Sequence, residues 1–185
     1  MTDDAIAIGG NQFPEQVETE RLTLSRPREA DLATYCEHIY TDSLVMRTLP
    51  GGKALSFGDA MARARANLLG HWKEHQFGPW LLRLNDDSVV IGHCGLRYWP
   101  DSSDVELLYA LGAEYWGRGL AYEAAKVSLR IGVESLGLSE VIAAAFTDNL
   151  ASMRVLEKVG MTPRDIVEFS GRDVQMFEYA IEARS

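Results

Sequence analysis

The chain has little cysteine and lacks a long apolar run. Cys36 and Cys94 are its only cysteines among 185 residues, and two cysteines form neither a disulfide framework nor a four-cysteine metal site. No apolar run approaches the roughly 20 residues that a membrane-spanning helix needs. The acidic residues 1–4 do not resemble a signal peptide. These absences predict a cytoplasmic protein without a membrane partner.

Basic residues are also scarce, since 18 Lys and Arg stand against 27 Asp and Glu and give a formal charge of -9. Because nucleic-acid binders carry a basic surface stripe, no nucleic-acid partner is expected. An acidic chain is compatible with a cationic substrate such as an amine, although solubility alone explains the acidity.

His71 and His75 have helical i, i+4 spacing, but no third ligand completes a zinc site, so no metal is predicted.

The length suits one domain with a sizeable core. Residues 1–16 have no clear period and contain Gly9-Gly10-Asn11. We therefore expect a loose N-terminal arm at 1–16 and a single domain at 17–185.

Hydrophobic periodicity predicts an α+β fold on one mixed sheet flanked by helices. The expected strands lie at 19–27, 80–84, 89–98, 105–111, 141–146, 164–169 and 174–181, and the expected helices at 29–39, 56–74, 120–136 and 150–159. The second to fourth strands form an antiparallel meander. The continuous apolar run 141–146 is typical of a strand parallel to its neighbour, here 105–111. Gly92 and Gly95 suggest a bulge in the strand that contains them.

A glycine-rich turn joins the strand at 105–111 to the helix that starts at Leu120. The helix start leaves backbone N–H groups free, and Gly117-Arg118-Gly119 lets an anion approach them, so the turn predicts a phosphate site. A Walker loop is excluded because no Gly-Lys-Ser/Thr follows. A dinucleotide fingerprint fits poorly because Tyr122 stands where it needs a third glycine. A plain strand-to-helix turn is the remaining alternative.

Residues 116–121 (WGRGLA) resemble the phosphate loop Gln/Arg-x-x-Gly-x-Gly/Ala of the GNAT acyltransferase superfamily, with Trp116 in place of the Gln/Arg. Trp-Gly-Lys/Arg-Gly-x-Ala is typical of its RimJ/RimL-like branch. Four further segments are similar to that branch in the same order, 19–24 (TERLTL), 28–31 (READ), 91–95 (IGHCG) and 148–161 (DNLASMRVLEKVGM). The resemblance spans residues 19–181 and implies the GNAT fold with acetyl-CoA as co-substrate and no metal.

The resemblance also implies roles for particular residues. Backbone groups of the loop are expected to bind the pyrophosphate, and those of the preceding strand the pantetheine arm. Asn149 is expected beside that arm and Ser152 near the sulfur, as a catalytic proton donor, although both residues could simply cap their helix. Glu106 is the candidate general base, or else an edge glutamate without a chemical role. The expected cofactor-binding residues are Leu108, Tyr109, Ala110, Leu111, Trp116, Gly117, Arg118, Gly119, Leu120, Ala121, Asn149 and Ser152.

The function implied is acetyl-CoA-dependent N-acetylation of a primary amine, either a protein N-terminus or a small molecule. Attack is expected to be direct, in a ternary complex, because no Cys/His pair suggests a covalent intermediate. The enzyme is expected as a monomer or homodimer, with acceptor contacts from residues 40–54 and the last hairpin. Two alternatives are a non-catalytic acyl-CoA sensor and a donor such as succinyl-CoA, for which Arg97 is the candidate cation.

Overall fold

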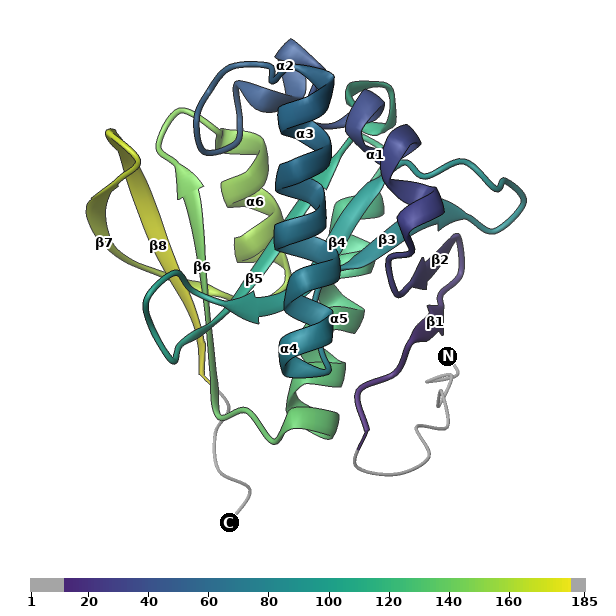
Figure 1. Ribbon diagram of the computed structural model, residues 1–185. Coiled ribbons are helices and arrows are strands. Elements are labelled where there is room, and N and C mark those ends of the chain that lie inside the picture. Colours follow the sequence, from purple (N-terminus) through teal and green to yellow (C-terminus); the bar gives the residue numbers. More distant parts are fainter. Residues whose placement is uncertain (1–11, 181–185) are drawn as a thin grey trace.

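The computed structural model describes residues 12–180, and within them the strands form one sheet of eight in the order β1-β2-β3-β4-β5-β6-β8-β7 (Figure 1). Every neighbouring pair is antiparallel except β5 and β6. The strands are β1 (Gln16–Glu18), β2 (Leu22–Ser25), β3 (Trp80–Leu84), β4 (Gly92–Tyr98), β5 (Val105–Leu111), β6 (Glu140–Phe146), β7 (Thr162–Phe169) and β8 (Arg172–Ala180). This mixed sheet confirms the expected fold class.

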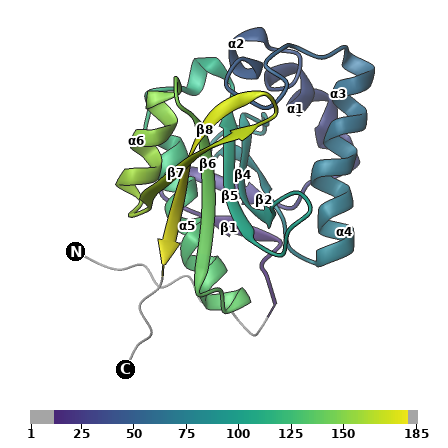
Figure 2. The ribbon, with the colours of Figure 1, turned by 90° about the vertical axis from the view of Figure 1, so that its left-hand side faces the viewer.

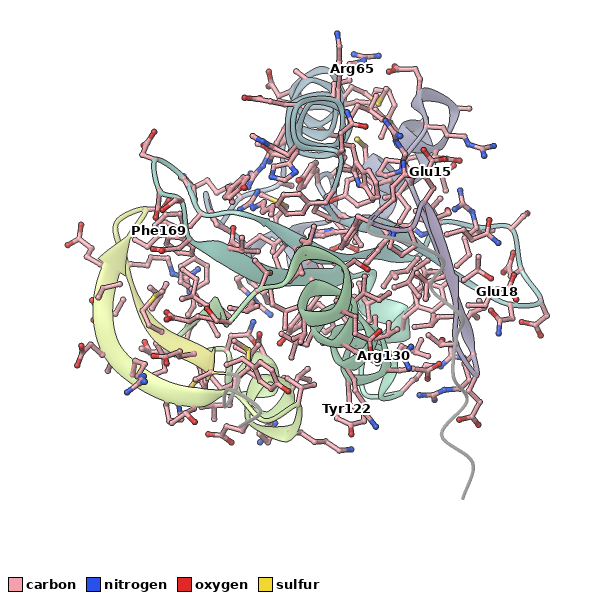
Figure 3. All side chains as sticks on the ribbon, turned by 90° about the horizontal axis from the view of Figure 1, so that it is seen from below. Glu15, Glu18, Arg65, Tyr122, Arg130 and Phe169 are labelled. Atoms are coloured by element: carbon pink, nitrogen blue, oxygen red, sulfur yellow. The ribbon has the colours of Figure 1, made fainter. Side chains whose placement is uncertain are left out.

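Helices cover both faces of the sheet, as Figure 2 shows from the side. One layer contains η1 (Glu29–Asp31), α1 (Leu32–His38), α2 (Ser43–Met46), α3 (Phe57–Ala64), the π-helical η2 (Arg65–Gly70) and α4 (His71–His75). The other contains α5 (Leu120–Leu136) and α6 (Leu150–Lys158), and a short η3 (Ala113–Tyr115) precedes α5. In Figure 3, Arg65 lies on the first layer, whereas Tyr122 and Arg130 lie on the opposite side of the sheet.

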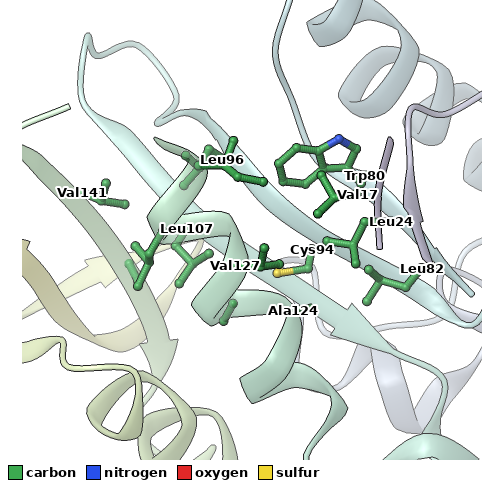
Figure 4. Close-up of a cluster of buried hydrophobic side chains, with 14 of the residues drawn as sticks. Val17, Leu24, Trp80, Leu82, Cys94, Leu96, Leu107, Ala124, Val127 and Val141 are labelled. Atoms are coloured by element: carbon green, nitrogen blue, oxygen red, sulfur yellow. The ribbon is translucent and has the colours of Figure 1, made fainter. Parts of the chain in front are cut away.

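Each layer has its own hydrophobic core. Cys94, Leu96 and Leu107 point from the sheet towards Ala124 and Val127 of α5 (Figure 4). The residues that alternate with them, such as Ala110, face the other core, to which α1, α2, α3 and η2 contribute. This alternation follows from the two-residue period of a strand. It decides which side chains of β4 and β5 reach which helical layer.

Local capping signals fix the ends of the helices. Gly119 (φ 77°) precedes α5 and Gly137 (φ 62°) follows it, both in the left-handed conformation that favours glycine. Ser56 caps α3 by accepting a hydrogen bond from the Asp59 backbone N–H at 3.2 Å. Both helices therefore begin where the sequence predicts.

The N-terminal segment is packed where the structure describes it. Residues 1–11 of the expected loose arm lie outside the described residues. Phe13 is 4% exposed and stacks on the Trp80 ring at 4.6 Å. The Trp80 indole N–H donates to the Pro14 carbonyl at 2.8 Å, and β1 pairs with β2 from Gln16 onward. Residues 13–16 are thus held by the fold, contrary to a loose arm through residue 16.

The expected bulge is wrong, because β4 and β5 keep an unbroken register from Gly92 to Tyr98. A Cβ atom on Gly92 would lie 2.2 Å from the Ala110 carbonyl oxygen, and one on Gly95 would lie 2.7 Å from Pro79 Cα. These glycines permit close backbone approach instead. The four-residue α2 and the separate β1 were not predicted, and the helix expected at 56–74 contains the π-helical segment η2.

Candidate active site

A gap opens in the centre of the sheet between β5 and β6. These two parallel strands are in register only at Glu106 and Ile142. The Gly112 N–H donates to the Ile91 carbonyl at 2.9 Å, so strand alternation turns the backbone groups of Glu106, Leu108 and Ala110 towards β4. The backbone groups of the alternate residues, including Tyr109, are turned towards the gap. No strand faces them there within the described residues.

Both sides of the gap offer backbone groups to a ligand. On the other side of the gap, the Thr147 N–H donates to the Asp173 carbonyl at 3.2 Å and so faces β8. Because successive residues of a strand turn their backbone groups to opposite sides, those of Ala144 and Phe146 in β6 face the gap. The Trp116 indole N–H donates to the Leu111 carbonyl at 2.8 Å, which closes the end of β5. Of the four β5 residues expected to hold the pantetheine arm, only Tyr109 and Leu111 therefore direct backbone groups into the gap.

A pocket of about 490 Å³ passes through the sheet at this gap. On one face Glu106, Leu108 and Ala110 line it, and on the other face Leu107 and Tyr109 do so. Apart from Arg118, all of the predicted site residues line this pocket, namely Glu106, Leu108, Tyr109, Ala110, Leu111, Trp116, Gly117, Gly119, Leu120, Ala121, Asn149 and Ser152. One cavity thus brings together residues from strands on both sides of the gap and from the start of two helices.

The glycine turn lies at one end of the pocket and is supported from the β1–β2 connection. Gly117 (φ 71°) and Gly119 (φ 77°) are left-handed, and no atom lies within 4 Å of a Cβ built on Gly117. Arg21 donates to the Arg118 carbonyl at 2.9 Å and pairs with Glu123 of α5 at 2.7 Å. This bracing of the loop by Arg21 was missed by sequence reasoning, because the two partners are about a hundred residues apart.

Arg118 is exposed, and its guanidinium lies 5.7 Å from the centroid of the Tyr115 ring. The side chain therefore packs outside the pocket. Arg118 therefore contributes to the glycine turn through its backbone and not through its side chain.

Tyr109, Ser152 and Asn149 meet on the face covered by α5 and α6. The Asn149 side chain caps α6 by accepting from the Ser152 backbone N–H at 3.1 Å. The Tyr109 hydroxyl lies 2.8 Å from Ser152 Oγ and donates to the Ser152 carbonyl at 3.0 Å. Burial raises the pKa of the Tyr109 hydroxyl, so it keeps its proton. This hydroxyl was not predicted as a functional group, and only strand alternation could have pointed to it.

Glu106 and Arg97 form an ion pair on the opposite face. The Arg97 Nε–H donates to Glu106 Oε1 at 2.5 Å, and Glu106 is 5% exposed. Burial raises the pKa of the Glu106 carboxyl, and the adjacent Arg97 guanidinium opposes part of this rise. The pocket thus holds a buried carboxyl that binds a proton more readily than an exposed glutamate.

Further residues on this face were missed by sequence reasoning. The Arg63 guanidinium lies 4.8 Å from the centroid of the Tyr40 ring. His93 Nδ1 lies 3.0 Å from the Tyr35 hydroxyl oxygen. Burial, together with the positive charges of Arg97 and Arg63, lowers the pKa of His93 to about 3 and keeps it neutral. The sequence carries no local signal for these groups, since they belong to separate elements.

The segments expected to contact the acceptor do border the pocket. Residues 40–54 contribute Tyr40, Val45, Thr48, Leu49 and Pro50, and the last hairpin contributes Phe169 and Val174. Trp99 packs on Phe169 with ring centroids 4.8 Å apart. Arg172 joins the two segments, because it donates to the Arg47 carbonyl at 3.0 Å and pairs with Asp148 at 2.9 Å.

Other chemistries receive no support from the described residues. Burial raises the pKa of Cys36 to about 11 and of Cys94 to about 12, so neither thiol is an activated nucleophile. Within residues 12–180, no three His, Cys, Asp or Glu side chains gather as a metal site. In the same range, no helix has the length and apolarity to cross a membrane.

Known families and proteins resemble this sequence. The family model for the acetyltransferase (GNAT) domain matches residues 21–162. The chain is 26% identical to the uncharacterized N-acetyltransferase p20 of Bacillus licheniformis over 178 residues, which cover 92% of this chain and 97% of that protein.

Solved structures share the fold. A GnaT-family acetyltransferase from Bordetella pertussis superposes with a TM-score of 0.77 at 24% identity, over 90% of this chain and 100% of that one. RimL, a ribosomal L7/L12 alpha-N-protein acetyltransferase in complex with coenzyme A, superposes with a TM-score of 0.73 at 15% identity, over 91% and 97%. At these identities the likeness is one of fold.

Proposed function

Because the chain belongs to the GNAT acetyltransferase family, we propose that it is an acetyl-CoA-dependent N-acetyltransferase of the RimJ/RimL-like branch that acts on a primary amine. The observation that carries this proposal is the pocket through the sheet. It joins a hydroxyl donor, Tyr109, on one face to a buried carboxyl, Glu106, on the other. A donor and an acceptor can therefore enter from opposite faces and meet at the gap.

The coenzyme end of the pocket is formed by the glycine turn and the edges of the gap. Backbone N–H groups at the start of α5 bind the pyrophosphate, helped by the positive end of the helix dipole. The free backbone groups of Tyr109 and the N–H of Leu111, whose carbonyl is bonded to Trp116, pair with the amides of the pantetheine arm as an added strand would. The residues fit this ligand, because the two glycines leave the loop backbone open and no strand occupies the gap. When bound, acetyl-CoA supplies the activated acetyl group.

Tyr109 and Glu106 would move the two protons of the reaction. The Tyr109 hydroxyl is protonated at neutral pH. With coenzyme A bound, it would turn its O–H from the Ser152 carbonyl to the departing sulfur, while the Ser152 hydroxyl donates to the Tyr109 oxygen at 2.8 Å. Glu106 accepts the proton of the attacking amine, directly or through water. Glu106 already neutralises the charge of Arg97, which weakens the attraction of Arg97 for a second carboxylate and favours an acetyl donor over a succinyl donor.

The test is incubation of the protein with acetyl-CoA and a panel of amines and peptides, with thiol release as the signal. Turnover that falls in Glu106→Gln and Tyr109→Phe, while coenzyme A affinity is retained, is the expected result. Coenzyme A binding without turnover of any amine would instead favour the sensor alternative. Failure to bind coenzyme A at all would contradict the site itself.

A further inference from the structure

The pocket has a positive lining in a negatively charged protein. The chain carries a formal charge of -9, yet the charged residues that line the pocket are Arg63, Arg97, Arg154, Lys158 and a single carboxylate, Glu106. Arg154 and Lys158 belong to α6, on the face that we assign to the coenzyme. Arg63 and Arg97 lie on the acceptor face.

One positive charge on the acceptor face has no compensating negative charge. Glu106 neutralises Arg97 through their ion pair at 2.5 Å. His93 is neutral at physiological pH, since its pKa is lowered to about 3. Arg63 has no carboxylate within salt-bridge distance among residues 12–180. A ligand with one negative charge at this end of the pocket would therefore compensate the charge of Arg63.

Arg63 lines the cavity, and its guanidinium is held by two other lining residues. Its Nη1 donates to the Pro50 carbonyl at 3.1 Å, and the Tyr40 ring lies 4.8 Å away. A guanidinium has five N–H donors, so several remain for a ligand. The planar fork of arginine matches a carboxylate in a bidentate manner, and partial burial strengthens such a contact.

Arg65, two residues further along the same helical run, provides the contrast. It is exposed and binds Glu29 with two bonds, at 2.6 and 2.8 Å. It does not line the pocket, and Figure 3 shows it on the outer side of the helical layer. One helix thus presents a paired arginine to solvent and an unpaired arginine to the cavity.

We infer that the acetyl acceptor is a small amine that also carries a carboxylate, such as a free amino acid, and that Arg63 binds this carboxylate. The inference rests on the proposed function and adds a substrate class to it. The amine of such an acceptor lies towards Glu106 and its carboxylate towards Arg63. Its body contacts the apolar wall formed by Tyr40, Leu49 and Trp99, which favours an apolar or aromatic side chain.

The experiment compares matched amines by kcat/KM with saturating acetyl-CoA. Phenylalanine, phenylalaninamide and phenethylamine share one body and differ in the carboxylate. We expect wild-type protein to prefer phenylalanine by about 10- to 100-fold, the range for one charge-assisted hydrogen-bonded contact. In Arg63→Gln this preference disappears through a raised KM for phenylalanine, whereas turnover of phenethylamine falls far less than that of phenylalanine. Arg63→Lys retains part of the preference, and Arg65→Gln behaves as wild type.

The outcomes separate this inference from the proposed function. Equal turnover of phenylalanine and phenethylamine by wild-type protein overturns the inference and leaves the acetyltransferase proposal standing, as does acetylation restricted to peptides without a nearby carboxylate. An equal loss for both amines in Arg63→Gln also overturns it. No turnover with any amine contradicts the proposed function and the inference together. The wild-type comparison does not depend on whether a variant folds.

Discussion

A carboxylate placed in the glycine turn should destroy coenzyme A binding without unfolding the protein. Gly117→Asp adds a negative charge at the loop that we assign to the pyrophosphate. Gly171→Asp, in the β7–β8 turn outside the pocket lining, is a matched control. The two glycines have φ angles of 71° and 73°, and no atom lies within 4 Å of a Cβ at either position. Both variants therefore carry the same added charge and the same backbone strain, about 1–2 kcal/mol.

The expected effect follows from Coulomb's law. At a separation of roughly 6 Å and an effective dielectric constant of roughly 20 to 80, each phosphate charge repels the new carboxylate by about 0.7–2.8 kcal/mol. Two phosphate charges give about 1.4–5.5 kcal/mol, which raises the Kd by about 10- to 10,000-fold. Gly171→Asp should leave the Kd within about twofold of wild type, since salt screens distant charges.

Titration calorimetry with coenzyme A measures this difference, and pantetheine is the internal control because it lacks the phosphates. Gly117→Asp should bind pantetheine like wild type while losing coenzyme A. Urea unfolding should show the same modest loss of stability in both variants. Unchanged coenzyme A affinity in Gly117→Asp, or an equal loss in Gly171→Asp, would refute the assignment of the pyrophosphate to this loop.

Three further predictions concern catalysis, pH and packing. Tyr109→Phe should lower kcat by about 100- to 10,000-fold with little change in the KM for acetyl-CoA; a change in KM alone would contradict its role as proton donor. His71 accepts a hydrogen bond from the Tyr98 N–H at 3.1 Å and burial lowers its pKa to about 4, so its contribution to stability should be complete above pH 6.5 and lost as pH falls towards 4. Urea unfolding across that range should show this loss, and a His71→Phe variant with the same pH slope would contradict it. Gly92→Ala should destabilise the protein by more than about 2 kcal/mol, because its Cβ would lie 2.2 Å from a backbone atom. Gly132→Ala should cost less, because the atom 2.4 Å from its Cβ is the flexible end of a leucine side chain. Equal losses of stability for the two variants in urea unfolding would argue against this.

Sequence reasoning succeeded where structure is set by neighbours along the chain. Gly119 and Gly137 mark the two ends of α5, and Asn149 caps α6. Both signals could be predicted because left-handed glycines and capping side chains act within a few residues. The parallel position of β6 followed from its continuous apolar run. These signals were enough to predict the mixed sheet and the turn between β5 and α5.

Sequence reasoning failed where the determining contact is distant in the sequence. Phe13 packs on Trp80, and Arg21 braces the glycine turn, through partners that no local pattern identifies. The uncompensated charge of Arg63 is likewise a property of the cavity, since it depends on which carboxylates are absent nearby. Gly92 was misread as a bulge because a close approach between strands leaves the same glycine signature as a bulge.

The single paired position between β5 and β6 has a mechanical consequence. Strands β1 to β5 and strands β6 to β8 form two panels of the sheet, which pair with each other at one backbone position. Helix α5 connects the two panels along the chain. A ligand bound in the gap forms backbone hydrogen bonds with both β5 and β6 and so holds the two panels together. Hydrogen exchange in β6 and β8 should therefore slow on coenzyme A binding far more than exchange in β2 and β3, so that the ligand sets how cooperatively the two panels unfold.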